Sequence, residues 1–62
     1  MAVEVYCWKT SDGRWRAYSH ERHVGTTDFS RDEVLREIHR QINGAIVVLD
    51  NKPIEGVMNN GK

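Results

Sequence analysis

The architecture of this chain is set by residues 30–44, which read SRDEVLREIHRQING. Ser30, followed three positions later by Glu33, fits a capping box, the pattern that satisfies free backbone N–H groups where a helix begins. Four apolar residues then fall in one arc of about 100° at 3.6 residues per turn: Val34, Leu35, Ile38 and Ile42. Asn43 and Gly44 end the pattern, and we expect Gly44 to be the left-handed cap residue. The stretch predicts one amphipathic helix.

The residues around the start of this helix support the same boundary. Phe29 before the cap and Val34 inside the helix fit a hydrophobic staple, in which the two side chains pack together. Asp32 and Glu33 place negative charge at the positive end of the helix dipole. We therefore expect the helix to begin directly after Ser30.

Two strands are predicted before the helix and one after it. Residues 2–9, AVEVYCWK, and residues 14–20, RWRAYSH, alternate between two faces as strands do. Asp12 and Gly13 between them predict a hairpin turn in which Gly13 has a positive φ. Residues 45–49, AIVVL, form an apolar run that is too short and too β-branched for a second helix. This run predicts a buried return strand.

The rest of the chain is polar or short. Residues 21–28 are expected to form a loop, and residues 54–58 an additional short edge strand weakened by Gly56. Residues 1–58 are then a single α+β domain, and residues 59–62 a flexible tail.

The predicted fold is a β-hairpin, one amphipathic helix and a return strand, in the order ββαβ. A right-handed crossover over the helix would place the return strand beside the first strand. The sheet would be mostly antiparallel, with the helix on one face and the optional fourth strand outside the return strand.

Size and charge limit what such a domain can do. A chain of 62 residues has one small core, and small scaffolds usually need a disulfide, a metal or self-association. Cys7 is the only cysteine, so no internal disulfide can form, and a lone cysteine favours a reducing cytoplasm. Nothing resembles a signal peptide or a membrane span. Nine basic and nine acidic residues balance, which disfavours nonspecific nucleic-acid binding. Self-association is the support that remains.

The strand alternation separates the side chains of the sheet into two sets. Those expected to face the helix are Val3, Val5, Cys7, Trp15 and Ala17. The opposite side of the sheet, called the outer face below, is expected to carry Tyr6, Trp8, Arg16 and Tyr18. The return strand would add either Ile46 and Val48 or Val47 and Leu49. Because one helix covers only one face, an outer face rich in aromatic and aliphatic residues needs an explanation.

Three explanations are open. Tyr6 and Tyr18 can be a cross-strand pair that stabilises the sheet and is half-shielded by the following loop. A homodimer, packed sheet to sheet or strand to strand, would supply the missing core. A different partner, either protein or nucleic acid, would use the face for binding. In the nucleic-acid version the aromatic rings stack bases, and Arg14, Arg16 and Arg22 hold phosphates. Glu4 and Glu21 nearby oppose that version.

Catalytic and metal chemistry is sparse. His20 and His23 lie three residues apart, but zinc needs four donors, or three donors and a water, so we expect two solvated histidines. Cys7 is expected to point inward as a small core residue, not as a nucleophile. No glycine-rich phosphate loop is present. We expect no cofactor, no metal and no enzymatic activity.

Three motifs are similar to known proteins: Val3-x-Val5, Asp12-Gly13-Arg14-Trp15, and Phe29-Ser30-x-x-Glu33-Val34. They resemble short bacterial and phage proteins of unknown function that combine a strand, a "dG-x-W" turn, a capped helix and an apolar return strand. The layout is also similar to the partner-binding domain of HicB-type antitoxins. That pattern usually has a proline before the helix, and residues 20–27 have none. The resemblance implies a small module that binds a protein or itself and carries no catalytic residues.

The expected function is that of a non-enzymatic, cytoplasmic protein-interaction module of the kind that phages or mobile elements encode. It would be a homodimer or bind another protein through Tyr6, Trp8, Arg16 and Tyr18 on the outer face. The alternative is a binder of single-stranded nucleic acid that uses the same face.

Overall fold

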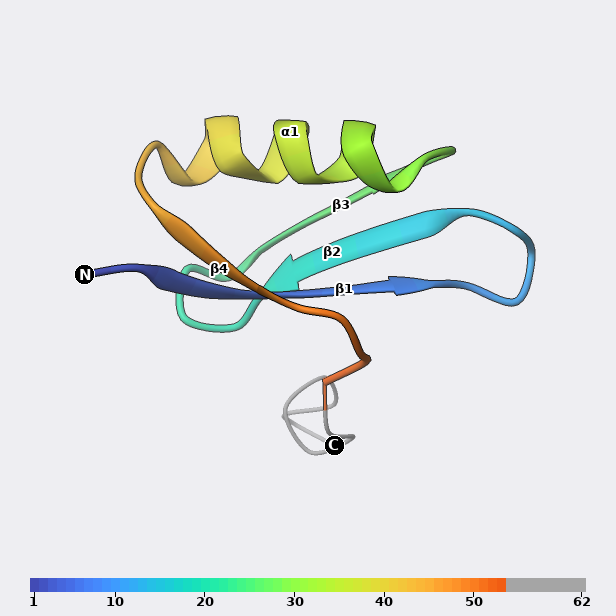
Figure 1. Ribbon diagram of the computed structural model, residues 1–62, viewed down its shortest axis with the longest axis horizontal. Helices are drawn as coiled ribbons and strands as arrows, with labels where there is room; N and C mark the ends of the chain where they lie inside the picture. Colours follow the sequence, from blue (N-terminus) through green and yellow to red (C-terminus); the bar gives the residue numbers. More distant parts are fainter. Residues whose placement is uncertain (54–62) are drawn as a thin grey trace.

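The structure is a computed structural model, and it describes residues 1–53. A four-stranded sheet carries one helix on one of its faces (Figure 1). The elements in chain order are β1 (Val3–Lys9), β2 (Trp15–Ser19), β3 (Val24–Asp28), α1 (Arg31–Ile42) and β4 (Ile46–Leu49). The α+β class and the packing of the helix on the sheet are confirmed.

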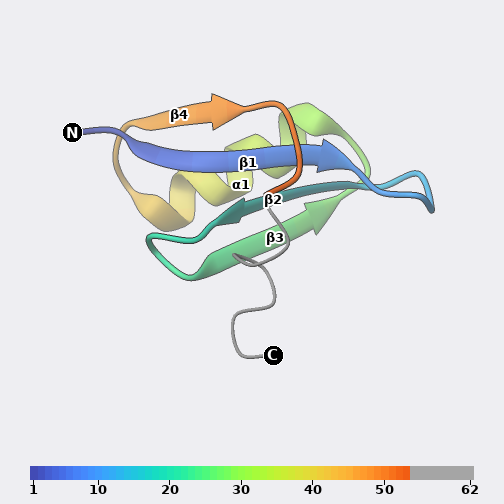
Figure 2. The ribbon, with the colours of Figure 1, turned by 90° about the horizontal axis from the view of Figure 1, so that it is seen from below.

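The strands lie in the order β3-β2-β1-β4, as the view from below the sheet shows (Figure 2). β1 is antiparallel to β2, and β2 is antiparallel to β3, whereas β4 runs parallel to β1. The return strand therefore lies beside the first strand, as predicted. The expected strand at 54–58 and the expected tail at 59–62 lie outside the described residues.

The prediction of a loop over residues 21–28 is confirmed for residues 21–23 and was wrong for the rest, because Val24–Asp28 form the edge strand β3. Its pairing with β2 puts Thr26 opposite Ala17 and Gly25 opposite Tyr18. The strand is hard to recognise because an edge strand needs few apolar residues, and Gly25 weakens the local signal. Its inward side is fixed by a tertiary contact instead, since the Thr26 hydroxyl donates to Oε1 of Glu37 at 2.7 Å.

The core lies between the sheet and one side of α1. Its buried members are Val3, Val5, Cys7, Ala17, Val34, Ile38 and Ile42. These include four of the five hairpin residues expected to face the helix, and the fifth, Trp15, is half-buried and packs against the cluster. Fully burying an aliphatic side chain stabilises a fold by roughly 1.5–3 kcal/mol, so a core this small leaves a thin margin against chain entropy.

The two ends of α1 are capped differently from each other. At the start, Ser30 Oγ accepts a hydrogen bond from the N–H of Glu33 at 3.2 Å, which confirms the N-cap. At the end, Asn43 has the left-handed conformation with φ 58°, and its N–H donates to the carbonyl of His39 at 2.8 Å. The prediction that Gly44 takes this role was wrong by one residue. Asparagine tolerates the left-handed region better than most residues, so it can end the helix itself.

The expected staple between Phe29 and Val34 was also wrong, because Phe29 is 75% exposed while Val34 is fully buried. β3 continues to Asp28, so Phe29 follows directly on the edge strand and does not reach the core. Its ring lies instead beneath the guanidinium of Arg14, 5.2 Å from ring centroid to Cζ.

The chain after β4 turns to the side of the sheet opposite to α1 (Figure 1). Nη2 of Arg31, in the first turn of the helix, lies 2.7 Å from Oδ1 of Asp50. The hydrogen bond to the Asp50 carboxylate raises the pKa of the Arg31 guanidinium. Residues 50–53 then pass in front of β1 when the sheet is viewed from below (Figure 2), and Pro53 is buried. The outer face is therefore partly crossed by its own chain. Within residues 1–53, no helix is long and apolar enough to cross a membrane.

Candidate functional site

The outer face brings the four predicted residues together on two neighbouring strands. Tyr6 of β1 lies directly opposite Tyr18 of β2, and Trp8 lies opposite Arg16. All four side chains are half-buried. The structure therefore places the predicted set in one continuous area.

The two outer strands complete this face. On β4, the register with β1 places Val47 beside Glu4 and Leu49 beside Tyr6, so these two face outward while Ile46 and Val48 pack toward the core. On β3, Thr27 Oγ1 accepts a hydrogen bond from Arg16 Nη1 at 2.9 Å. This bond draws the guanidinium of Arg16 toward β3.

Gly25 leaves room for two of the side chains on the outer face. A Cβ at this position would lie 3.4 Å from Nη2 of Arg16 and 3.5 Å from Cδ1 of Tyr18. The ring of Tyr18 thus lies against a strand segment that has no side chain of its own. A cross-strand aromatic ring over a glycine shields the backbone and offsets part of the weakness of glycine in a strand.

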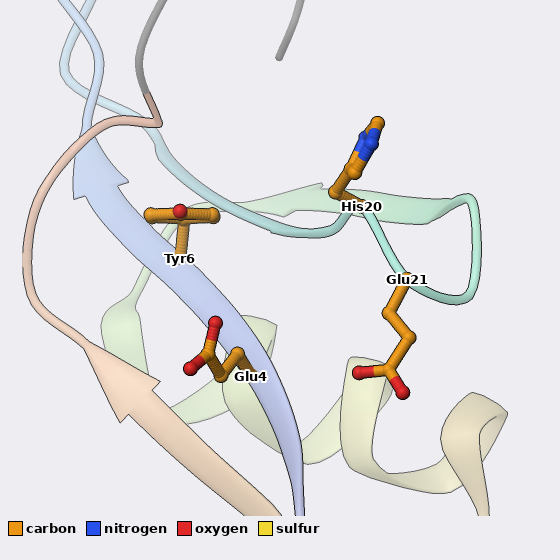
Figure 3. Close-up of a pocket in the computed structure, with 4 residues that line it drawn as sticks. All are labelled: Glu4, Tyr6, His20 and Glu21. Carbon is orange, nitrogen blue, oxygen red and sulfur yellow. The ribbon is translucent and has the colours of Figure 1, made fainter.

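A pocket opens beside Tyr6, with a volume of about 310 Å³. It is lined by Glu4 and Tyr6 from β1 and by His20 and Glu21 from the loop after β2 (Figure 3). We call it the Tyr6 pocket. Ligand pockets commonly measure roughly 300–1,000 Å³, so this one has room for a single side chain or a small ion and not for a large cofactor.

The loop between β2 and β3 positions the second wall of the Tyr6 pocket. The hydroxyl of Tyr18 and Nδ1 of His20 share a hydrogen bond at 3.2 Å. The N–H of Arg22 donates to Oγ of the buried Ser19 at 3.2 Å, and His23 turns the chain with φ 57°. The rings of His20 and His23 lie 5.7 Å apart. These contacts fix the loop that carries His20 and Glu21.

The pocket is acidic and aromatic in character. Glu4 and Glu21 line it together with Tyr6 and His20, and no lysine or arginine is among these four lining residues. A cation gains from nearby carboxylates and from the face of an aromatic ring. The arrangement therefore suits a positively charged group.

The other two arginines of the predicted nucleic-acid set lie elsewhere. Arg14 is in the hairpin turn, where Nε lies 3.7 Å from the carboxylate of Asp12 and the guanidinium covers Phe29. Arg22 is exposed in the loop after β2. Only Arg16 shares the outer face with Tyr6 and Tyr18, and its guanidinium is bound to Thr27.

Cys7 is the one thiol of the chain, and it lies in the core at 1% exposure. Burial raises the pKa of the Cys7 thiol above its ordinary value, although the positive charge of Arg31 opposes part of this effect. A protonated thiol is a poor nucleophile and a poor metal ligand. Among residues 1–53, no group of three or more histidine, cysteine or acidic side chains is arranged to hold a metal ion.

Sequence reasoning missed the pocket although it singled out all four residues that line it, Tyr6 as a member of the outer face and the other three in other roles. Glu4 and Glu21 were interpreted only as charges that oppose nucleic acid, and His20 as a solvated loop residue. The alternation of β1 already puts Glu4 on the same side as Tyr6. Nothing local in the sequence places His20 and Glu21 beside them, because that depends on the hairpin of β2 and β3.

No protein-family model, no curated protein and no solved structure matches this chain.

Proposed function

We propose that this chain is a non-enzymatic protein-interaction module whose outer face receives a basic side chain of a partner protein. The observation that carries the proposal is the Tyr6 pocket, in which the carboxylate-bearing residues Glu4 and Glu21 line the same cavity as Tyr6. Lysine and arginine are the protein side chains that match this chemistry.

The energetics of such a contact are modest but specific. A cation over a tyrosine ring contributes about 0.5–2 kcal/mol, depending on how far it is desolvated. Charge-assisted hydrogen bonds to carboxylates are roughly twice as strong as neutral ones. Arginine would gain most, because its planar guanidinium can stack on Tyr6 and donate to a carboxylate at the same time. The half-buried Trp8, Tyr18 and Leu49 nearby would supply apolar contact around the basic group.

The same geometry weakens the nucleic-acid alternative. A base stacked on Tyr6 would bring its phosphates close to Glu4 and Glu21, and like charges repel. Arg14, which was expected to hold phosphate, is occupied by Asp12 and Phe29. The balanced charge of the chain points the same way.

The proposal also covers the cellular compartment of the protein and the type of genetic element that encodes it. A free, buried cysteine favours work in the reducing cytoplasm. The likeness in motif layout to short phage proteins and antitoxin domains supports a role as a small adaptor encoded by a phage or a mobile element.

The test is a binding titration with short peptides that differ in one charge. Isothermal titration calorimetry would compare Gly-Arg-Gly and Gly-Lys-Gly with Gly-Glu-Gly, all with blocked ends. A millimolar dissociation constant, equal to about 4 kcal/mol, is expected for the basic peptides and no measurable binding for the acidic one. Added salt should weaken binding, because the contact is electrostatic and partly exposed.

Two variants make the test specific to the pocket. Removing both carboxylates, in Glu4→Gln with Glu21→Gln, should lower the affinity for the arginine peptide at least fivefold. The matched control is Asp32→Asn with Glu33→Gln, which also removes two charges, because both residues are exposed on the helix and glutamine serves equally in a capping box. An oligothymidylate that binds more tightly than the peptides, or equal losses in both sets of variants, would contradict the proposal.

A further inference from the structure

β4 is the most apolar strand of the sheet, yet none of its four residues is buried. Val47 is 46% exposed, and Ile46, Val48 and Leu49 are half-buried. The cause is position: β4 is an edge strand beside β1, whereas α1 packs mainly on β3, β2 and β1. An apolar parallel strand normally has both faces covered. β4 therefore presents an apolar surface that no other part of residues 1–53 covers fully.

Among residues 1–53, no strand pairs with the outer edge of β4, so its backbone groups on that side have no partner in this part of the chain. The N–H of Val3 donates to the carbonyl of Ala45 at 3.0 Å, and Val3 lies opposite Ile46. In a parallel ladder alternate residues face the neighbouring strand, so Ala45 and Val47 turn toward β1. The N–H and C=O groups of Ile46 and Val48 then point to the open edge. Lysine, proline or a bulge usually protects such an edge, and β4 has none of them.

We propose that a second copy of this chain pairs with β4 edge to edge, antiparallel, about a two-fold axis that passes beside Val47. In this register Ile46 of each copy lies opposite Val48 of the other. The outward N–H and C=O groups of Ile46 and Val48 then form hydrogen bonds with the same groups of the second copy. The side chain of Val47 lies against the side chain of Val47 of the second copy. Every side-chain pair across the seam is aliphatic, which is the self-complementarity that a two-fold interface requires.

The charges at the two ends of β4 favour a second copy over an unrelated strand. Asp50 follows the strand; its Oδ1 binds Arg31 of the same chain, but its side chain is 65% exposed. The basic last turn of α1, with His39 and Arg40, precedes the strand. Antiparallel pairing brings Asp50 of one copy opposite Gly44 of the other, close to that basic turn, and the symmetry repeats the contact. Because the net charge of the chain is zero, two copies do not repel each other at long range.

The area argues for a reversible dimer. Stable dimers commonly bury roughly 800 Å² per partner, which would be nearly a fifth of the 4288 Å² surface of this chain. Pairing along four residues buries less than that. The dimer therefore forms at high concentration and dissociates on dilution.

Edge pairing would leave the Tyr6 pocket free, so this inference goes beyond the proposed binding function and does not depend on it. A two-fold axis perpendicular to the sheet puts both helices on one side and both outer faces on the other. Two four-stranded sheets become one continuous sheet with two Tyr6 pockets on the same side. A partner with two basic segments would then be held by both copies at once, with a gain in avidity.

The test measures mass in solution and introduces a charge at the axis. In sedimentation velocity, the wild-type mass should rise from 7.2 kDa toward twice that value as the concentration increases. Val47→Lys should weaken association at least tenfold, because it places two ammonium groups against each other at the axis. Val47→Glu should do the same, and an equal mixture of the two variants should regain association. Only a residue that meets itself across a two-fold axis gives this pattern.

Controls separate association from folding. Val47 is exposed and lies beside Glu4 in register, so the Val47→Lys variant should keep its fold, with the new ammonium group next to that carboxylate. Ser11→Lys adds the same charge at an exposed position of the turn between β1 and β2, away from β4, and should leave the wild-type mass curve unchanged. If Val47→Glu is unfolded by its neighbour Glu4, Val47→Cys replaces it and should form a disulfide between the two copies on oxidation.

Two results would overturn the inference. A wild-type chain that stays monomeric up to about a millimolar would show that β4 does not pair. A dimer that Val47→Lys leaves unchanged would show that another surface holds the copies together. Peptide binding to the wild-type chain, measured at concentrations where it is monomeric, tests the pocket separately from the edge.

Discussion

Tyr6 and Tyr18 lie directly opposite each other on β1 and β2, but each contacts a different neighbourhood. Tyr6 forms one wall of the pocket with Glu4, while Tyr18 binds His20 through its hydroxyl and lies against Gly25. One residue of the pair thus lines the site and the other orders the loop that closes it. The two tyrosines therefore belong both to the pairing of β1 with β2 and to the surroundings of the Tyr6 pocket.

The pair should be coupled in stability. Tyr6→Ala and Tyr18→Ala should each destabilise the fold, and the double variant should lose less than the sum of the two. Cross-strand aromatic pairs contribute roughly 0.2–1 kcal/mol beyond alanine, so the coupling free energy should fall in that range. Urea unfolding of the four proteins measures it. Strictly additive losses would mean that the two rings do not stabilise each other.

The end of the helix gives a second prediction, because Asn43 has the left-handed conformation and its neighbour Gly44 does not. Asn43→Gly should be neutral or stabilising, whereas Asn43→Ala should cost about 1 kcal/mol, since alanine is strained there. Gly44 has an ordinary φ and open space around its Cα, so Gly44→Ala should stabilise by about 0.4–1 kcal/mol through the unfolded chain. Thermal unfolding of the three variants checks this. A large loss in Gly44→Ala would place the cap at Gly44 after all.

Cys7 provides a prediction about pH. Burial holds the thiol pKa above its ordinary value of 9.0, so the folded chain keeps the proton that the unfolded chain loses. The contribution of Cys7 to stability is therefore complete below pH 9 and declines as the pH rises through the raised pKa of the folded state. Cys7→Ala should lack this alkaline decline when unfolding free energies are compared across pH.

The same burial should protect the thiol from reagents. Alkylation by iodoacetamide at about pH 8, followed by mass spectrometry, should be at least tenfold slower in the folded chain than in urea. Rapid alkylation of the folded chain would show that Cys7 is reached without unfolding, and would return it to consideration as a reactive group.

The features of the structure that the sequence predicts are those that depend on residues close together in the chain. The helix from Ser30 to Asn43 follows from capping chemistry and apolar spacing, and the Asp12-Gly13 turn fixes which residues of the hairpin share a face. Tyr6, Trp8, Arg16 and Tyr18 could therefore be grouped before the structure was known. These signals need only neighbouring residues.

The parts that failed depend on pairing between distant segments. β3 is held by Thr26 and Glu37, which are eleven positions apart, and its own residues are too polar to reveal a strand. The apolar run of β4 does not reveal which of its residues face outward, and only the register with β1 shows that these are Val47 and Leu49. The Tyr6 pocket could not be predicted for the same reason, since its walls come from two distant segments, β1 and the β2–β3 loop.

The measurement that tests the central claim most directly is an NMR titration of the isotope-labelled chain with methylguanidinium, which mimics an arginine side chain. Methylguanidinium should shift the signals of Glu4, Tyr6, His20 and Glu21 selectively, and acetate at the same concentration should not. Shifts spread evenly over the acidic surface, or centred on the helix carboxylates Asp32 and Glu33, would contradict the account of the outer face as a binding site for basic groups.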